Sequence, residues 1–309
     1  MTALLPLADP AAAEAPAPSS APPRGRRRPS GRLAARRGAP LVANIVVWAY
    51  AAFSAYPLLW LLLQTFRSDA QILGDPWGIP LRPSVEAYAT AFSTTPLPQY
   101  FLNSLIVTLA TVSLTVACCV GAGYAFSRLR FPGSTAVFTV FIGVLVIPAP
   151  VLLLPRFLIS GELGILNSYI GLIAPFSAGA LAVGTFLIKT HFDQIPDSLV
   201  EAAELDRATP WQVLRLVMLP QIGPAAATIG VLSFMGAWNE YIYSVVALRS
   251  PELFTLPVGI ADIAAKQYLY GYAPVFAAMV VAALPVYLAF LLAQRFFLRA
   301  FALGGGVKG

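Results

Sequence analysis

Acidic side chains are concentrated in residues 196–224, a polar stretch that lies between two long apolar runs. Four carboxylates fall inside this stretch and one comes just before it, out of fourteen acidic residues in the chain: Asp193, Asp197, Glu201, Glu204 and Asp206. Carboxylates gathered on one exposed surface attract and orient the basic groups of another molecule. The chemistry that this pattern predicts is therefore the docking of a soluble partner.

A second candidate site lies inside an apolar run and combines aromatic, amide and acidic side chains: Trp238, Asn239, Glu240 and Tyr241. Glu240 is the one acidic residue within a predicted membrane segment, where a charge is costly unless it is paired or hydrated. Polar groups beside aromatic rings suit a sugar, which offers hydroxyls and flat apolar faces. We expect these residues to line a substrate path. The alternatives are that Glu240 lies at a shallow depth or bonds a neighbouring subunit.

The sequence contains few residues that could serve in catalysis or metal binding. His191 is the single histidine, which excludes a zinc site built on paired histidines. A Ser–His–Asp triad would have to use this histidine, and no nucleophile motif lies near it. Cys118 and Cys119 are adjacent within an apolar run, so they predict packing rather than a disulfide framework or a metal site. A membrane-embedded enzyme would need clustered Asp, His or Lys at one depth, and the sequence has no such cluster.

The composition places the chain in a membrane. Of its 309 residues, 58% are hydrophobic and 11% are charged, whereas soluble domains carry about 25% charged residues. An apolar helix of about 20 residues crosses a bilayer, and six candidates are present at roughly 41–63, 100–125, 135–155, 168–188, 223–248 and 273–294. We therefore predict an all-α, polytopic membrane protein with six transmembrane helices, formed by residues 41–309.

The basic residues predict the orientation. Residues 1–40 read as a disordered basic tail, and seven of the twenty basic residues lie within residues 24–37, so they do not form a nucleic-acid patch. The tail and the loops on its side carry fifteen basic residues, and five are assigned to the other side: Arg67, Arg82, Arg156, Arg249 and Lys266. The positive-inside rule then puts both termini and the acidic stretch in the cytoplasm. The tail is also placed to contact anionic membrane lipid.

Local signals predict a helix–turn–helix within the acidic stretch. Ser198 and Glu201 have the spacing of a capping box at the start of a short helix, on which Glu201 and Glu204 share one face. A second box begins at Thr209, with proline at the first helical position, and its helix ends before Pro220.

Three elements of this stretch resemble the EAA loop of ABC-importer permeases: Glu201-Ala202-Ala203, Asp206 and Leu219-Pro220. In that family the loop is a coupling helix that docks into a groove of the cytoplasmic ATPase subunit. The family usually has glycine directly after the aspartate, whereas this chain has Arg207. Glycine permits a left-handed turn, which costs other residues roughly 1 kcal/mol or more. The sequence leaves open whether the turn is built differently or Arg207 accepts the strain.

The C-terminal sequence QRFFLRAFALGGGVKG and the Trp-Asn-acid-aromatic run are similar to those of the second permease of carbohydrate importers, such as the maltose importer. The resemblance covers most of residues 40–309. It implies a permease subunit in a bacterial inner (plasma) membrane, importing an oligosaccharide or related sugar. The implied partners are a second permease, a cytoplasmic ATPase dimer and an extracytoplasmic sugar-binding protein.

The resemblance also implies that the loop at 249–272 enters the binding protein's sugar site and that the C-terminal tail reaches the ATPase. The chain has no Walker A sequence, so ATP and Mg belong to the ATPase and no cofactor is expected here. Two alternatives remain open. One is the permease of a glycerol-phosphate importer. The other is a self-sufficient secondary carrier, which needs ion-coupling carboxylates within the membrane and has Glu240 alone.

Overall fold

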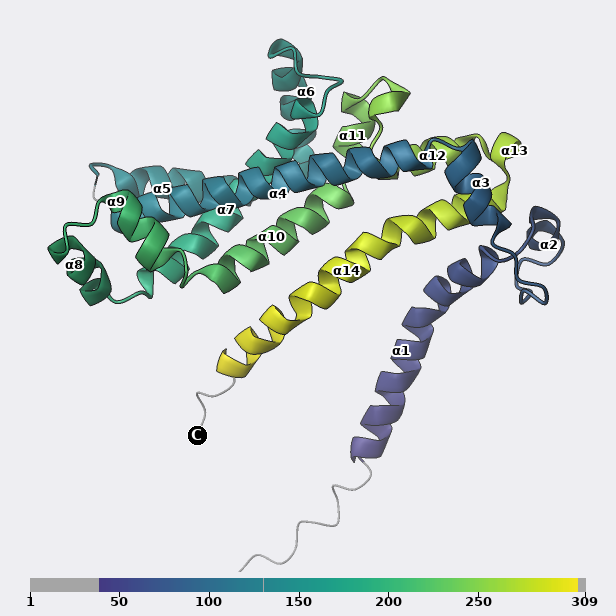
Figure 1. The fold of residues 1–309 in the computed structure, drawn as a ribbon, viewed down its shortest axis with the longest axis horizontal. Coiled ribbons are helices and arrows are strands. Elements are labelled where there is room, and N and C mark those ends of the chain that lie inside the picture. The colour runs from purple at the N-terminus through teal and green to yellow at the C-terminus, as the bar shows by residue number, and fades with distance from the viewer. Residues whose placement is uncertain (1–38, 130, 305–309) are drawn as a thin grey trace, which may run out of the picture. The chain divides into compact units, whose positions relative to one another are not determined.

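The computed structural model describes residues 39–304 except residue 130. Every regular element within that range is a helix, as predicted (Figure 1). Residue contacts divide the chain into two units, Met1–Ala55 and Tyr56–Gly309, and the elements described below belong to the second unit unless stated. The disordered tail predicted over residues 1–40 lies almost wholly outside the described residues, as do the last five residues of the C-terminal motif.

Four helices are long and apolar enough to cross a membrane. They correspond to the first, second, fourth and sixth predicted spans: α1 (Ala39–Gln64), which crosses the boundary between the two units, α4 (Leu97–Arg128), α7 (Ile170–Asp193) and α14 (Tyr272–Gly304). The described residues also hold two bent helix pairs, which bring the number of spans to six if each pair counts as one.

The third predicted span, 135–155, is a broken helix in the structure. It consists of two helical segments separated by a bend of 102°: α5 (Ser134–Gly143) with η1 (Val144–Val146), and η2 (Ala149–Leu152) with α6 (Leu153–Glu162). Pro148 and Pro150 fall at the bend, where proline lacks an N–H and disfavours a helical preceding residue. Arg156, assigned by sequence to an outer loop, is therefore part of α6.

The fifth predicted span, 223–248, is also interrupted. α10 (Gly223–Trp238) ends before Glu240, and the short α11 (Ile242–Ala247) follows. The Glu240 carboxylate accepts hydrogen bonds from the backbone N–H groups of Tyr243 and Ser244, at 2.8 and 3.0 Å. A side chain that takes these amides favours a new helix start over continuation of the old helix.

α4 and α7 approach each other closely because glycines face the contact. A Cβ atom on Gly123 would lie 2.5 Å from Ile188, and one on Gly184 would lie 2.4 Å from the Cys119 sulfur. Small residues permit this approach between membrane helices. Cys119 is buried in this contact, in agreement with the packing role predicted for it.

Short helices connect the long ones at the end of the molecule opposite the acidic stretch: α2 (Asp69–Gly74), α3 (Glu86–Thr94), η4 (Pro251–Leu253), α12 (Leu256–Ala265) and α13 (Gln267–Tyr270). The Asp69 carboxylate accepts from the backbone N–H groups of Tyr272 and Ala273, which fastens this region to the start of α14. A hydrogen bond from the Lys266 amine to Asp262 raises the pKa of Lys266.

Candidate functional site

The acidic stretch folds as the predicted helix–turn–helix. Its helices are α8 (Asp197–Leu205) and α9 (Pro210–Gln212), the latter continuing as the π-helical segment η3 (Val213–Met218). The capping box at Thr209 is confirmed, because Gln212 Oε1 accepts from the Thr209 backbone N–H at 2.7 Å and the Thr209 hydroxyl accepts from the Gln212 N–H. The chain then bends by 88° into α10.

The capping box predicted at Ser198 is wrong. α8 begins two residues earlier than such a box requires, at Asp197, with Pro196 as its N-cap and no side-chain capping bond. The reason is a tertiary contact that the local sequence does not contain, because Asp197 forms an ion pair with Arg128 at the end of α4. The Glu201 carboxylate is therefore not used in capping and makes no hydrogen bond within the described part of the chain.

Arg207 occupies the left-handed turn that glycine permits in related loops, with φ of +59°. Its N–H donates to the Glu204 carbonyl at 2.9 Å, and the Ala208 N–H donates to the Ala203 carbonyl at 3.0 Å. These two bonds form the Schellman motif, which ends a helix through one left-handed residue. The arginine thus accepts the conformation, and Asp206 is the C-cap that precedes it.

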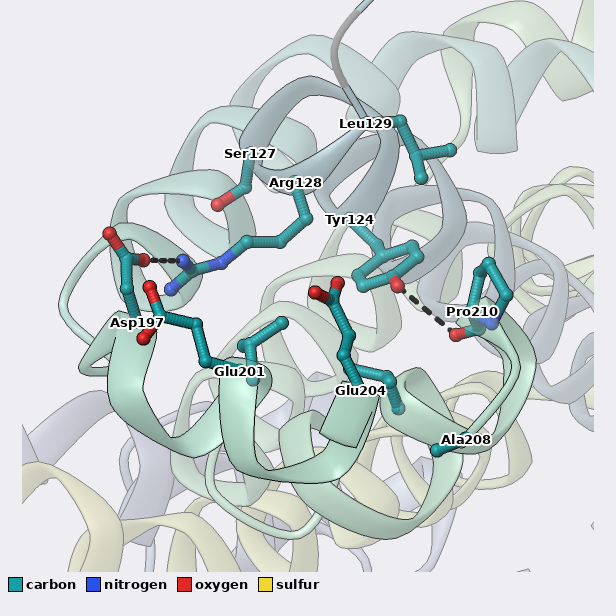
Figure 2. Close-up of a pocket in the computed structure, with 11 residues that line it drawn as sticks. Tyr124, Ser127, Arg128, Leu129, Asp197, Glu201, Glu204, Ala208 and Pro210 are labelled. Atoms are coloured by element: carbon teal, nitrogen blue, oxygen red, sulfur yellow. Dashed lines mark hydrogen bonds and ion pairs between the residues drawn. The ribbon is translucent and has the colours of Figure 1, made fainter. Parts of the chain in front are cut away.

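A pocket of about 710 Å³ lies between this loop and the C-terminal end of α4. Its walls include the carboxylates of Asp197, Glu201 and Glu204 on one side and the side chains of Tyr124 and Arg128 on the other. Figure 2 shows Glu201 and Glu204 directed toward those two α4 residues. The pocket is therefore acidic, and two of its carboxylates are available to a basic group.

Arg128 fastens the loop to the membrane helices. Its guanidinium pairs with Asp197 and donates to the carbonyls of Phe192 and Ile195, both at 2.6 Å. The arginine side chain is 13% exposed. One side chain therefore joins the ends of α4 and α7 to the beginning of α8.

Tyr124 makes the second connection, one helical turn before Arg128. Its hydroxyl donates to the Pro210 carbonyl at 3.0 Å (Figure 2). Its ring packs edge-to-face on Phe192 with centroids 6.0 Å apart. Sequence reasoning did not single out either residue as part of the site. The available signal was a Tyr and an Arg four positions apart at the polar end of an apolar run.

The remaining loop residues lie at the surface or at the end of the second helix. Ala202 is exposed, and Leu205 on α8 is 86% exposed. Leu219 and Pro220 lie beyond η3, where the Leu219 N–H donates to the Leu214 carbonyl at 2.8 Å. The predicted coupling residues thus fall into two groups, one on α8 with its turn and one at the bend before α10.

The second candidate site does not form one continuous polar surface. Trp238 is 2% exposed, donates to the Ala282 carbonyl at 3.1 Å and stacks on Phe234. Glu240 caps α11, as described above, while Asn239 and Tyr241 are exposed. Trp238 and Asn239 also line a largely apolar pocket of about 470 Å³ beside α14. Trp238 and Glu240 have structural roles here, and the lining of a substrate path stays a prediction.

Comparisons with known proteins identify the family of the chain. The family described as "Binding-protein-dependent transport system inner membrane component" matches residues 117–302. A diacetylchitobiose uptake permease of Streptomyces coelicolor is 32% identical, over 82% of this chain and 83% of its own length. A sulfoquinovosyl glycerol permease of Agrobacterium fabrum is 32% identical, over 82% and 89%. A maltose/maltodextrin permease of Vibrio vulnificus is 35% identical, over 86% and 95%.

Among solved structures, a chain of a bacterial ABC transporter that imports the acidic polysaccharide alginate has a TM-score of 0.76 and 24% identity, covering 84% of this chain and 97% of that chain. This likeness shows a shared fold. The family match and the identities to the curated relatives carry the assignment further: the chain belongs to the family of inner membrane components of binding-protein-dependent transport systems, and it is an ABC transporter permease, a transport subunit rather than an enzyme.

Proposed function

We propose that this chain is the permease subunit of an importer for an oligosaccharide or a related sugar, and that α8 and its turn couple ATP hydrolysis to transport. Three relatives with similar identity are named for diacetylchitobiose, sulfoquinovosyl glycerol and maltose, which supports a glycoside as cargo. The observation that carries the coupling role is the Arg128 connection, because it joins the exposed loop to both α4 and α7.

The loop offers an ATPase two kinds of contact. The exposed Leu205 and Ala202 provide apolar surface on α8. The pocket beside them holds the carboxylates of Glu201 and Glu204, which suit a basic side chain of the partner. ATP and Mg would be bound by that partner, so no cofactor is assigned to this chain.

Movement of the docked loop would be transmitted by the two α4 residues that hold it. Arg128 donates hydrogen bonds to the carbonyls at the end of α7, and Tyr124 donates one to the start of the second loop helix. When the ATPase dimer closes, a displacement of α8 therefore pulls on α4 and α7 together. The result would be alternating access, with a second permease completing the pathway and an extracytoplasmic binding protein delivering the sugar.

The experiment is charge reversal on the pocket wall. In the assembled transporter, Glu201→Lys should leave membrane insertion normal and abolish uptake and substrate-stimulated ATPase activity, because it puts a cation where a basic partner group must bind. Glu86→Lys is the matched control, since Glu86 is exposed at the opposite end of the molecule. Normal uptake by Glu201→Lys at normal expression would remove the main support for coupling through this loop.

The orientation is tested separately. In a background lacking both native cysteines, Ser84→Cys and Ala261→Cys should react with an impermeant thiol reagent added to intact cells, because both positions are exposed at the end assigned to the outside. Ser198→Cys and Val307→Cys should not react. Labelling of Ser198→Cys from outside would reverse the topology and separate the loop from cytoplasmic ATP.

A glycerol-phosphate importer is the second candidate function. The observation that favours it is the relative named for sulfoquinovosyl glycerol, a glycerol derivative that carries an acidic group. Uptake of glycerol 3-phosphate that depends on this chain would distinguish it from the oligosaccharide importer.

A further inference from the structure

We propose that Arg156 binds an acidic group of the cargo at the centre of the membrane, so that the importer carries an anionic carbohydrate with a carboxylate, sulfonate or phosphate. The inference rests on the proposed importer function and specifies its substrate class. It is carried by the position of this arginine, its lack of a partner and the broken helix that holds it.

The position follows from α7. A Cβ atom on Gly179 would lie 2.9 Å from Nη2 of Arg156, so the guanidinium lies against the α7 backbone at this glycine. At 1.5 Å per residue, Gly179 is about 14 Å from the beginning of α7 and about 21 Å from its end. The neighbouring Ser177 donates to the carbonyl of Thr111, midway along α4, which gives the same depth.

The charge of Arg156 is uncompensated within the described residues, where no hydrogen bond or ion pair to it is found. A guanidinium stays protonated in proteins, and at the centre of a bilayer it needs a partner or a hydrated cavity. The neighbouring segment α11 contains no acidic residue, and the carboxylate of Glu240 just before it is occupied by the backbone N–H groups of Tyr243 and Ser244. This part of the chain therefore supplies no compensating anion for Arg156.

The local backbone favours the transport path over lipid as the environment of this charge. α6 follows a bend of 102°, where the helical backbone is interrupted at residues 147 and 148. Interrupted backbone at membrane depth is tolerated where it is buried in protein or lines a water-filled cavity. Arg156 is half-buried, with one side of the guanidinium held against Gly179. Its remaining donors suit the paired oxygens of a carboxylate, sulfonate or phosphate.

The test measures the electrostatic environment with small charged reagents, so it does not require a known substrate. Ile159 lies about one turn from Arg156 on α6 and is 56% exposed. Each rate is divided by the rate of the same reagent with a free thiol in solution. In the assembled transporter without native cysteines, Ile159→Cys should then react about tenfold faster with a sulfonate-bearing methanethiosulfonate than with its trimethylammonium counterpart. Adding Arg156→Gln should reduce this ratio to about one, whereas Arg156→Lys should keep most of it.

Arg249→Gln is the matched control, because Arg249 is an exposed arginine on a loop, and it should leave the ratio unchanged. Three results would overturn the proposal. Absence of reaction at both Ile159→Cys and Arg156→Cys would place α6 against lipid. A ratio near one with Arg156 intact would mean that an acidic residue of another subunit already neutralises it. An equal effect of Arg249→Gln would mean that the field is not local.

Uptake identifies the cargo and separates this inference from the proposed function. Transporter-dependent uptake of an acidic disaccharide such as digalacturonate should fall at least about tenfold in Arg156→Gln, as expected when a site loses a charged hydrogen-bonding group. Transporter-dependent uptake of maltose that is unchanged by Arg156→Gln would overturn the anionic cargo. It would leave the importer function intact, since that function is tested by Glu201→Lys.

Discussion

Arg128 and Arg156 show how differently two regions of the same helical bundle treat a positive charge. Arg128, at the end of α4 beside the acidic stretch, pairs with Asp197 and donates to two carbonyls at the end of α7. Arg156 lies on α6 beside the middle of α7 and has no such partner in the described residues. An arginine that binds several groups of the fold fixes the position of the elements around it, and one without such partners remains available to a ligand. The same residue type therefore indicates mechanical connection in one region and recognition in the other.

The acidic residues also differ in how fully the fold uses them, but here the residue near the membrane segments is bonded and two of those on the loop are left unbonded in the described structure. Glu240 was predicted to line a path, but its carboxylate accepts hydrogen bonds from the backbone N–H groups of the segment that follows it. Glu201 and Glu204, on the loop, face a pocket and make no hydrogen bond within the described part of the chain. The functional interpretation of a charged residue thus depends on whether its side chain already makes hydrogen bonds within the fold.

The largest effect is expected from replacing Arg128. Arg128→Gln loses an ion pair and leaves the carbonyls of Phe192 and Ile195 unpaired, which should destabilise the protein by about 3 kcal/mol and release the loop. Thermal unfolding in detergent and limited proteolysis within residues 196–224 measure both effects. Arg128→Lys should rescue little, because one ammonium cannot reproduce the planar fork. Wild-type stability in Arg128→Gln would show that the loop is held by other contacts.

A smaller effect is expected at Glu240. Glu240→Ala removes the cap of α11 and should cost about 1 kcal/mol, the usual contribution of a capping side chain. Thermal unfolding should therefore shift modestly while transport persists. Loss of transport without loss of stability would instead favour the path-lining role, and Asn239→Ala is the companion variant, because its exposed side chain has no part in the cap.

The left-handed residues offer a matched pair with effects of opposite sign. Arg207 and Asn167 both have positive φ, at +59° and +53°. Arg207→Gly should stabilise the protein by roughly 1 kcal/mol, because glycine adopts this conformation without strain. Asn167→Gly should destabilise it, because the Asn167 side chain accepts from the backbone N–H groups of Arg249 and Ser250 at 2.8 and 3.0 Å.

The same Arg207→Gly variant distinguishes strain from docking. If Arg207 contacts the ATPase by its charge, the variant should lower the yield of the complex in pull-downs, with a loss that depends on salt. If the residue is merely strained, the yield should match wild type at low and high salt. We expect the second result, since the related loops function with glycine and no side chain at this position.

Features that depend on local sequence were predicted well. The long apolar runs predicted α1, α4, α7 and α14, and the second capping box at Thr209 formed as expected, because its partners lie three residues apart.

The errors share a physical cause, which is competition from groups distant in sequence or invisible to hydropathy. The capping box predicted at Ser198 does not form, because α8 begins at Asp197, which pairs with Arg128, 69 residues away in the sequence. The breaks at Pro148 and Glu240 are set by backbone hydrogen bonding, whereas hydropathy averages over them. Arg156 was assigned to a loop because a charge ended the apolar window, although α6 carries it to the centre of α7.

The central claim, that α8 docks on an ATPase, is tested most directly by photo-crosslinking from Leu205. A photoreactive amino acid at this 86% exposed position should form an adduct with the ATPase subunit in intact membranes. The same amino acid at Leu81, which is 91% exposed on the segment between α2 and α3, should not. Absence of an ATPase adduct from Leu205 in a transport-competent complex, or an equal yield from Leu81, would contradict the account.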